Sequence, residues 1–203
     1  MSHHPSADHI IDLYDRHAFT WHQKRANHFT DRKWIAHFGN MLKPSARVLD
    51  LGCGSGQPVA RHLVEIGTCV VGVDSSKQML VLCSAQFPEQ QWIHADMRTL
   101  TLGCQFDAII AWNSFFHLKP TDQRLMFPIF RRHAAPGALL MFTSGPSHGE
   151  ALGTFEGETL YHASLSTNEY VDQLHANGFE VLDHVVEDPD SGGLTVWLGR
   201  LLP

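Results

Sequence analysis

A glycine-rich turn directly after a short apolar run constrains the fold most. Arg47 to Leu51 (RVLDL) is typical of a buried strand, and the segment Gly52-Cys53-Gly54-Ser55-Gly56 follows it before a stretch of helical periodicity. Glycines let backbone approach a ligand closely, and the helix after them leaves N-terminal amides free to meet polar or negative groups. This order predicts an α/β fold with a ligand site at the turn.

The alternation of strand and helix continues along the chain. About 40 residues of helical periodicity, in two amphipathic stretches that end near Gly39, come before the first strand. Apolar runs and helical patterns then alternate, which predicts a parallel sheet covered by helices. Further strands are expected over 69–73, 92–93, 106–112, 138–143, 179–186 and 195–198, and helices over 59–66, 76–87, 121–133 and 166–178. The last two strands flank a Ser-Gly-Gly turn, which indicates an antiparallel pair.

Length and composition favour a single domain over 1–203, with a helical lid over 1–42 and an α/β core over 43–203. The 15 Lys and Arg residues against 21 Asp and Glu residues give a net charge of −6, the wrong sign for a nucleic-acid partner. No apolar run approaches the roughly 18 residues of a membrane span, and no signal peptide is evident. We therefore expect a cytoplasmic protein, either a monomer or a homodimer, that binds no membrane.

Cysteine and histidine usage gives no sign of a metal site. The four cysteines form no Cys-x-x-Cys pair and are expected to be reduced thiols, and the 15 histidines are scattered without ligand spacing. Metal is therefore expected to be absent.

Two acidic residues follow later strands. Asp74 ends the second strand, where a carboxylate can accept hydrogen bonds from both ribose hydroxyls of an adenosine, and Asp96 ends the third, near an adenine amino group. Gln57 stands where the dinucleotide fingerprint would place its third glycine. A ligand without a pyrophosphate is therefore favoured. Asp50 is expected to organise the turn through backbone amides.

The segments VLDLGCGSGQ, GVD, HADM and FDAIIAWNSFFHL resemble the successive motifs of class I S-adenosylmethionine-dependent methyltransferases. The resemblance implies a Rossmann-like, doubly wound sheet of seven strands, mostly parallel with an antiparallel last strand. It also implies S-adenosyl-L-methionine as cofactor and S-adenosyl-L-homocysteine as product. By this likeness the cofactor-binding residues of the core are Gly52, Cys53, Gly54, Gln57, Asp74, Ser75, Met79, Asp96, Met97, Ala111 and Trp112.

The opening segment IIDLYDRHAFTWHQKR resembles the N-terminal lids of small-molecule methyltransferases. The likeness implies that Tyr14 and Trp21 cover the sulfonium and that Arg25 pairs with the methionine carboxylate. Structural roles remain open for several residues. Tyr14 and Trp21 are compatible with a core, Arg25 with a solvated face, and Asp96 with a cap on the turn at Met97.

Methyl transfer requires mainly that the acceptor be held in line with the methyl group and that water be excluded. His117 follows the fourth strand and titrates near neutrality when unperturbed, so it is the candidate general base, with a packed histidine as the alternative. The segment 144–165 shows no clear period and is expected to be a long loop that walls the acceptor site with His148, Tyr161 and His162.

The sequence thus predicts a methyltransferase that acts on a small-molecule acceptor. The stretch Asn113-Ser114-Phe115-Phe116 lacks the prolines of the families that methylate nucleic-acid bases. Two alternatives stay open: a non-catalytic S-adenosylmethionine-binding module, and an NAD-dependent Rossmann oxidoreductase, which Gln57 and the lack of a Tyr-x-x-x-Lys pair disfavour.

Overall fold

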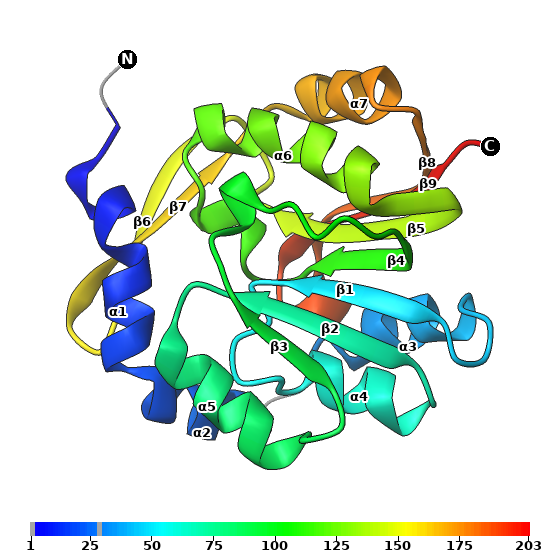
Figure 1. Cartoon of the computed structure of the whole chain (residues 1–203). Helices are drawn as coiled ribbons and strands as arrows, with labels where there is room; N and C mark the ends of the chain where they lie inside the picture. Colours follow the sequence, from blue (N-terminus) through cyan, green and yellow to red (C-terminus); the bar gives the residue numbers. More distant parts are fainter. Residues whose placement is uncertain (1–2, 28–29) are drawn as a thin grey trace.

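The computed structural model describes residues 3–27 and 30–203, and its centre is a seven-stranded sheet (Figure 1). The strand order is β3-β2-β1-β4-β5-β9-β8. Strands β1 to β5 pair in parallel, whereas β9 runs antiparallel to both of its neighbours. The strands are β1 Arg47–Leu51, β2 Cys69–Asp74, β3 Gln91–His94, β4 Phe106–Ala111, β5 Ala134–Ser144, β8 Phe179–Asp188 and β9 Leu194–Leu201. The predicted fold class is confirmed, and the single antiparallel strand is β9, the last strand in the chain.

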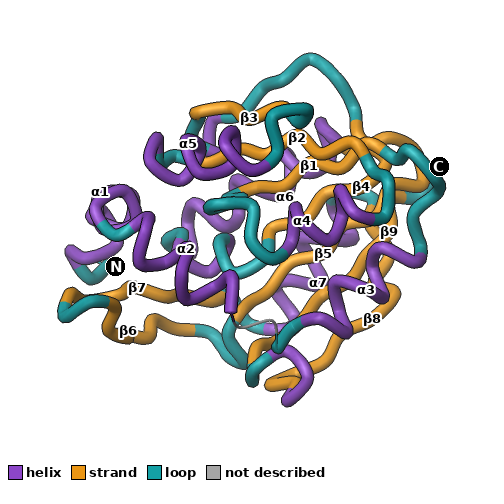
Figure 2. The backbone as a smooth tube through the Cα atoms, turned by 90° about the horizontal axis from the view of Figure 1, so that it is seen from below, coloured by secondary structure: helices purple, strands orange, loops and turns teal. Residues whose placement is uncertain are grey.

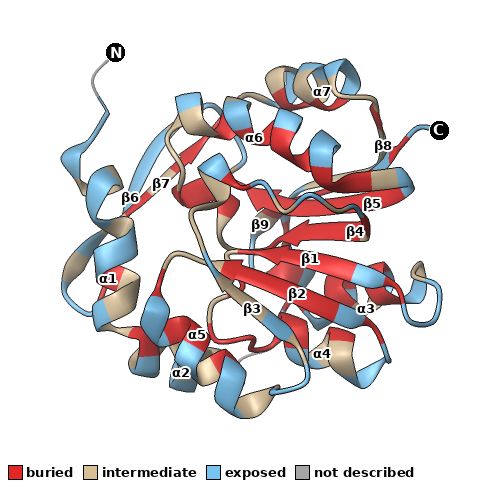
Figure 3. Cartoon of the chain, in the orientation of Figure 1, coloured by how far each residue is buried: buried red, intermediate tan, exposed pale blue. Residues whose placement is uncertain are grey.

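Helices cover both faces of the sheet, as the alternating pattern predicts (Figure 1). One face packs against α6 and α7, and the other against α3 and α4. The helices of the core are α3 Arg32–Asn40, α4 Val59–Glu65, α5 Lys77–Gln86, α6 Pro120–His133 and α7 Thr167–Ala176. The inner strands β1, β4 and β5 are buried almost throughout (Figure 3), because apolar side chains on both faces are covered.

The prediction of a long loop over 144–165 is wrong. Strands β6 Gly149–Phe155 and β7 Glu158–Ser164 form a separate antiparallel hairpin there. The two residues between them, Glu156 and Gly157, have φ values of 50° and 81°. Positive φ at both central residues is the geometry of a two-residue hairpin turn whose twist matches that of the flanking strands.

The predicted helical lid divides into two parts. The helices α1 Ile10–Arg16 and α2 Ala18–Asn27 lie beside α5, and α1 also lies against the hairpin (Figure 2), after the short turn η1 Pro5–His9. Helix α3 packs instead in the core layer beside α4, with Ile35 and Phe38 fully buried. The second predicted amphipathic stretch is therefore two helices, of which only α2 reaches the site described below.

Within residues 3–27 and 30–203, no helix combines the length and the apolar character needed to cross a bilayer. Three further single-turn helices lie in the core region, η2 Met97–Thr99, η3 Phe115–His117 and η4 Pro189–Ser191.

Candidate functional site

A cavity opens at the carboxyl ends of β1, β2 and β4, beneath α1 and α2. In an open parallel sheet this edge is where ligands bind, because helix N-termini and loops converge there. All but one of the predicted cofactor residues line it, with the predicted base: Tyr14, Trp21, Arg25, Gly52, Cys53, Gly54, Gln57, Asp74, Ser75, Met79, Asp96, Met97, Trp112 and His117. Ala111, the exception, is fully buried in β4, one residue before Trp112.

The glycine turn is tied to the end of β2 by Asp74. The backbone N–H of Gly54 donates to Asp74 Oδ2 at 2.8 Å, and the N–H of Ser76 donates to Oδ1 at 2.8 Å. Gly52 has φ +73°, and a Cβ there would lie 2.3 Å from Cβ of Ser114. The position therefore requires glycine, because an added side chain would collide with the turn after β4.

Asp50 does not hold the turn through amides as expected. Its carboxylate lines the cavity, and its buried Oδ2 atom has no partner among the described residues. Burial and the neighbouring charge of Asp74 raise the pKa of Asp50 to about 8. A cation placed beside such a carboxyl group favours its charged form and so lowers its pKa again.

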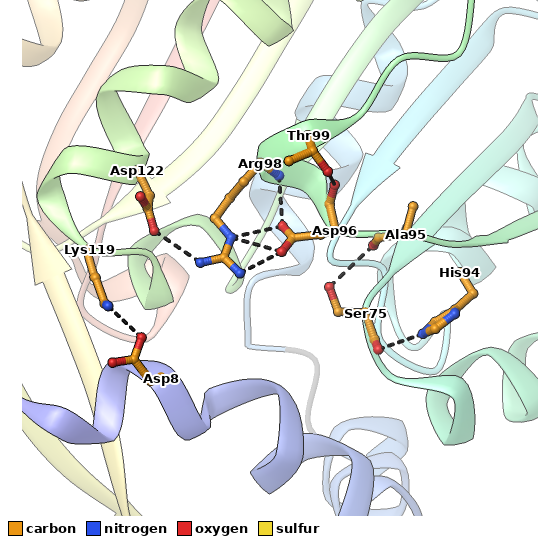
Figure 4. Close-up of polar contacts among 9 residues, drawn as sticks. All are labelled: Asp8, Ser75, His94, Ala95, Asp96, Arg98, Thr99, Lys119 and Asp122. Atoms are coloured by element: carbon orange, nitrogen blue, oxygen red, sulfur yellow. Dashed lines mark hydrogen bonds and ion pairs between the residues drawn. The ribbon is translucent and has the colours of Figure 1, made fainter.

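Asp96 is engaged by Arg98 (Figure 4). Its side chain accepts from the Arg98 backbone N–H at 2.9 Å, so it caps η2, and both of its oxygens accept from the guanidinium. Arg98 also donates to Asp122 Oδ2 at 3.1 Å, which connects the third strand's end to α6. The capping alternative for Asp96 is thus observed, and the carboxylate keeps its place at the cavity wall.

Tyr14 and His117 join the lid to the turn after β4. The hydroxyl of Tyr14 lies 2.9 Å from His117 Nε2, and His117 Nδ1 lies 2.7 Å from the carbonyl oxygen of Tyr161. A carbonyl only accepts, so Nδ1 carries the proton and Nε2 accepts from Tyr14. Burial and the neighbouring His162 lower the pKa of His117 to about 3. The expectation of a near-neutral titration is wrong, because the ring is buried in a largely uncharged environment.

Arg25 forms a buried ion pair beside the cavity. Its guanidinium donates to Asp31 Oδ2 at 2.9 Å, and the indole N–H of Trp112 donates to the same oxygen. The Arg25 side chain is only 15% exposed and the Asp31 side chain 1%. Arg25 is therefore held in a fixed position facing the cavity rather than solvated.

The three residues predicted to bind the acceptor do not lie together in the structure. His148 is exposed before β6 and lines neither cavity described here, and the Tyr161 side chain is buried with its hydroxyl donating to Glu150 Oε1 at 2.9 Å. His162 lines a second cavity, which adjoins the first. The hairpin explains this pattern, since alternate residues of a strand point to opposite faces.

Cys53 lies in the glycine turn and its thiol is buried. Burial beside Cys83 and Asp74 raises the pKa of the Cys53 thiol well above its usual value, so the thiol stays protonated. A protonated, buried thiol is a poor nucleophile, in agreement with a purely structural side chain at this position.

Several cavity residues were not predicted from the sequence. Arg98, Lys119 and Asp122 surround one end of the cavity, and the ammonium group of Lys119 contacts Asp8 of η1 (Figure 4). Asn113 lies between the two cavities. The signal available for Asn113 and Lys119 was their position just after β4 and before α6, at the carboxyl edge of the sheet.

Comparison with known proteins agrees with this geometry. Residues 48–137 match the family model described as a methyltransferase domain. This part of the chain, from β1 into β5, is similar to methyltransferase domains. The trans-aconitate 2-methyltransferase of Azoarcus sp. (strain BH72) is 35% identical over 127 residues, which cover 60% of this chain and 49% of that protein. The dTDP-3-amino-3,6-dideoxy-alpha-D-glucopyranose N,N-dimethyltransferase of Streptomyces fradiae is 27% identical over 202 residues, which cover 93% of this chain and 76% of that protein.

Solved methyltransferase structures share the fold of this chain. The Burkholderia thailandensis 1,6-didemethyltoxoflavin-N1-methyltransferase, with bound 1,6-didemethyltoxoflavin and S-adenosylhomocysteine, gives a TM-score of 0.77 at 17% identity, covering 100% of this chain and 92% of that one. Magnesium protoporphyrin IX methyltransferase from Synechocystis PCC 6803 gives 0.76 at 15% identity, covering 99% of each chain. The chain spans about half the length of the trans-aconitate methyltransferase it matches.

Proposed function

We propose that this protein binds S-adenosyl-L-methionine in the first cavity and transfers its methyl group directly to a small-molecule acceptor. One observation carries the proposal: the glycine turn, Asp74, the Arg25 guanidinium and the aromatic rings of Tyr14 and Trp21 all face the same cavity. This cofactor requires a carboxylate that binds its ribose, a cation that binds its carboxylate, and aromatic rings around its sulfonium.

The charges along the cavity fit the same molecule. S-adenosylmethionine supplies an electrophilic methyl group on a sulfonium and carries an ammonium and a carboxylate. Asp50 belongs to the cavity wall, and its buried Oδ2 has no partner among the described residues, so a cationic or N–H donor group of the cofactor would satisfy it. Arg25 supplies the opposite charge, and its pairing with Asp31 keeps it oriented.

The contribution of the protein is positioning and exclusion of water. Helices α1 and α2 cover the cavity, and the polar contacts that hold them to the core include Tyr14 to His117, His22 to Ser55 at 3.0 Å and Asp15 to Ser76 at 2.7 Å. In-line transfer depends mainly on holding the reacting atoms close in a dry site. We assign residues 3–27 to the lid over one catalytic domain.

The relatives support a small-molecule acceptor without choosing one. Their names specify trans-aconitate, an amino sugar nucleotide and a toxoflavin precursor, which are chemically unlike one another. The acceptor class therefore has to come from the chain's own residues.

A calorimetric titration tests the cofactor. We expect S-adenosylmethionine and S-adenosylhomocysteine to bind and NAD not to bind, and a ligand at 100 times its Kd adds about 2.7 kcal/mol to the unfolding free energy. Binding of NAD alone would withdraw the proposal. Formation of S-adenosylhomocysteine over a panel of acceptors then separates an enzyme from a module that binds the cofactor without turnover.

A further inference from the structure

A second cavity adjoins the first across the Tyr14–His117 contact. Both cavities share five lining residues: Tyr14, Trp21, Arg25, Asn113 and His117. The remaining wall comes from η3, from β7, from the turn at η4 with the start of β9, and from Thr30 before α3. A molecule in this second cavity would meet the proposed cofactor at the shared wall.

Resting on the proposed function, we propose that the second cavity holds the methyl acceptor, and that this acceptor is an uncharged planar molecule with a lactam N–H or a phenolic O–H at the reacting atom. Four features of the cavity carry this inference: its charge, its unpaired acceptor atom, its rings and its route for a proton.

The wall of the second cavity carries almost no net charge. Among its described residues Arg25 is the only one with a permanent charge, and both the buried carboxylate of Asp31 and the proposed cofactor carboxylate already engage it. No Asp or Glu of the described chain lines this cavity. An ammonium acceptor would lack a counter-ion, and a carboxylate acceptor would lack an unpaired cation, and each charge is costly to remove from water.

Asn113 offers a hydrogen-bond acceptor that nothing in the described chain uses. Its side-chain Oδ1 is buried and has no partner, while its backbone N–H donates to Thr143 Oγ1 at 3.0 Å. The residue has φ +54°, a conformation that costs free energy for a residue other than glycine. A buried, unpaired carbonyl oxygen is satisfied by an N–H or O–H donor of a ligand.

The rings around the cavity suit a flat molecule. The ring centroid of His162 lies 4.9 Å from that of His117 and 5.2 Å from that of Phe116, and the Tyr14 ring lies 5.3 Å from His117. Burial lowers the pKa of His162 below its ordinary value, which favours the uncharged ring. Aromatic walls of this kind stack well on planar ligands.

The Tyr14–His117 pair can take up the proton that the acceptor loses when it is methylated. When a neutral N–H or O–H group is methylated, a new bond forms from its lone pair to carbon, the carbon–sulfur bond breaks with its electron pair on sulfur, and the acceptor becomes a strongly acidic cation. Its proton passes to Tyr14 Oη, whose own proton passes to His117 Nε2, giving an imidazolium that later loses a proton to water. With a pKa of about 3, His117 accepts such a proton but not that of an alkylammonium, whose pKa is about 10.

Ring-matched probes test the acceptor class. The protein is saturated with S-adenosylhomocysteine and titrated with 2-quinolinone, 2-naphthol, 2-naphthoate or 2-(aminomethyl)naphthalene by saturation-transfer NMR and calorimetry. We expect the two neutral probes to bind at least tenfold more tightly than the carboxylate and the amine. Equal or tighter binding of a charged probe, or binding of no probe to the saturated protein, overturns the inference.

An isosteric variant checks that Asn113 is responsible. Asn113→Asp places a carboxylate in the second cavity, so we expect neutral-probe affinity to fall at least fivefold and amine affinity to rise. Asn168→Asp makes the same charge change on the exposed start of α7 and should change neither value. An unchanged probe preference in Asn113→Asp contradicts the proposal. Failure of S-adenosylhomocysteine itself to bind contradicts the proposed function before the probes are added.

Discussion

The hydroxyl of Tyr14 donates to Nε2 of His117 at 2.9 Å, joining the first lid helix to the turn after β4. The same Tyr14 ring packs on Phe155 of the hairpin and edge-on against Trp21 of α2. Lid, hairpin and sheet edge therefore meet at one side chain. Any motion that lifts α1 breaks the hydrogen bond to His117 and opens both cavities together.

Tyr14→Phe removes this hydrogen bond and keeps the ring. We expect turnover to fall 10- to 100-fold, with less than a threefold change in Kd for S-adenosylhomocysteine, because the proton route is lost and the cofactor wall is kept. In a double-mutant cycle with His117→Ala, the combined loss should be no greater than the larger single loss, since both residues act on one proton.

Tyr170→Phe is the matched control for the Tyr14 variant. It also deletes a hydroxyl, which bonds to Gln123 Oε1 at 2.6 Å, and neither residue of this pair lines either cavity described above. Both variants should lose about 1 kcal/mol or more of unfolding free energy, but only Tyr14→Phe should lose turnover. Full activity of Tyr14→Phe, or additive losses in the cycle, would show that the pair has only a packing role.

Asp74→Ala should weaken binding of S-adenosylhomocysteine at least tenfold. The substitution removes a proposed ribose acceptor and also the carboxylate that holds the Gly54 and Ser76 amides. Calorimetry measures the Kd, and Asp172→Ala on the exposed face of α7 is the control that should leave it unchanged. Unaltered affinity in Asp74→Ala would remove Asp74 from the cofactor site.

The fold was predictable because its strands are strong local signals. Apolar runs such as 69–73 and the capping box at Ser166, which accepts from the Glu169 amide at 3.2 Å, are read directly from neighbouring residues. The hairpin was missed because β6 is largely exposed and neither strand shows a strict alternation of polar and apolar residues, and its turn residues Glu156 and Gly157 are a weak hairpin signal.

The sequence predicted which residues lie at the cavity wherever their position follows from the carboxyl edge of the sheet. It did not predict the pKa values of those residues. The ends of β1 and β2 fix where Gly52 and Asp74 lie, whichever side chains surround them. The low pKa of His117 and the high pKa of Asp50 depend on burial by segments distant in sequence. Local patterns contain no information about that burial.

Asp50→Asn should change how stability depends on pH. In the folded protein the pKa of Asp50 is raised to about 8, whereas the unfolded chain has the ordinary value of 3.8. The folded state therefore binds the extra proton between these values, and the unfolding free energy falls as pH rises, by about 1.4 kcal/mol per pH unit from this group, until the slope decreases near pH 8.

The lowered pKa of His117 acts in the opposite direction, but only below its ordinary value of 6.5. Denaturant unfolding between pH 6.5 and 8 is therefore the informative range for Asp50. Wild type should lose stability there, and Asp50→Asn should lose less. Asp107→Asn is the control, because Lys43 and the Arg47 amide lower the pKa of that carboxyl and its effect is confined to acid. Equal slopes in wild type and Asp50→Asn would contradict the prediction.

Glu158→Gln should loosen the lid without unfolding the domain. The Glu158 carboxylate, at the start of β7, accepts from His17 Nε2 at 2.7 Å and from Arg16, and these contacts lower its pKa. We expect amide hydrogen exchange across α1 to speed up severalfold and S-adenosylhomocysteine to dissociate two- to fivefold faster, while the thermal midpoint hardly changes, because exposed ion pairs add little to global stability. Glu169→Gln removes a comparable pair with Arg124 between α7 and α6 and should leave both rates unchanged. If exchange in α1 is the same in wild type and Glu158→Gln, the Glu158 contacts do not hold the lid closed, and closure rests on the contacts of Tyr14, Asp15 and His22.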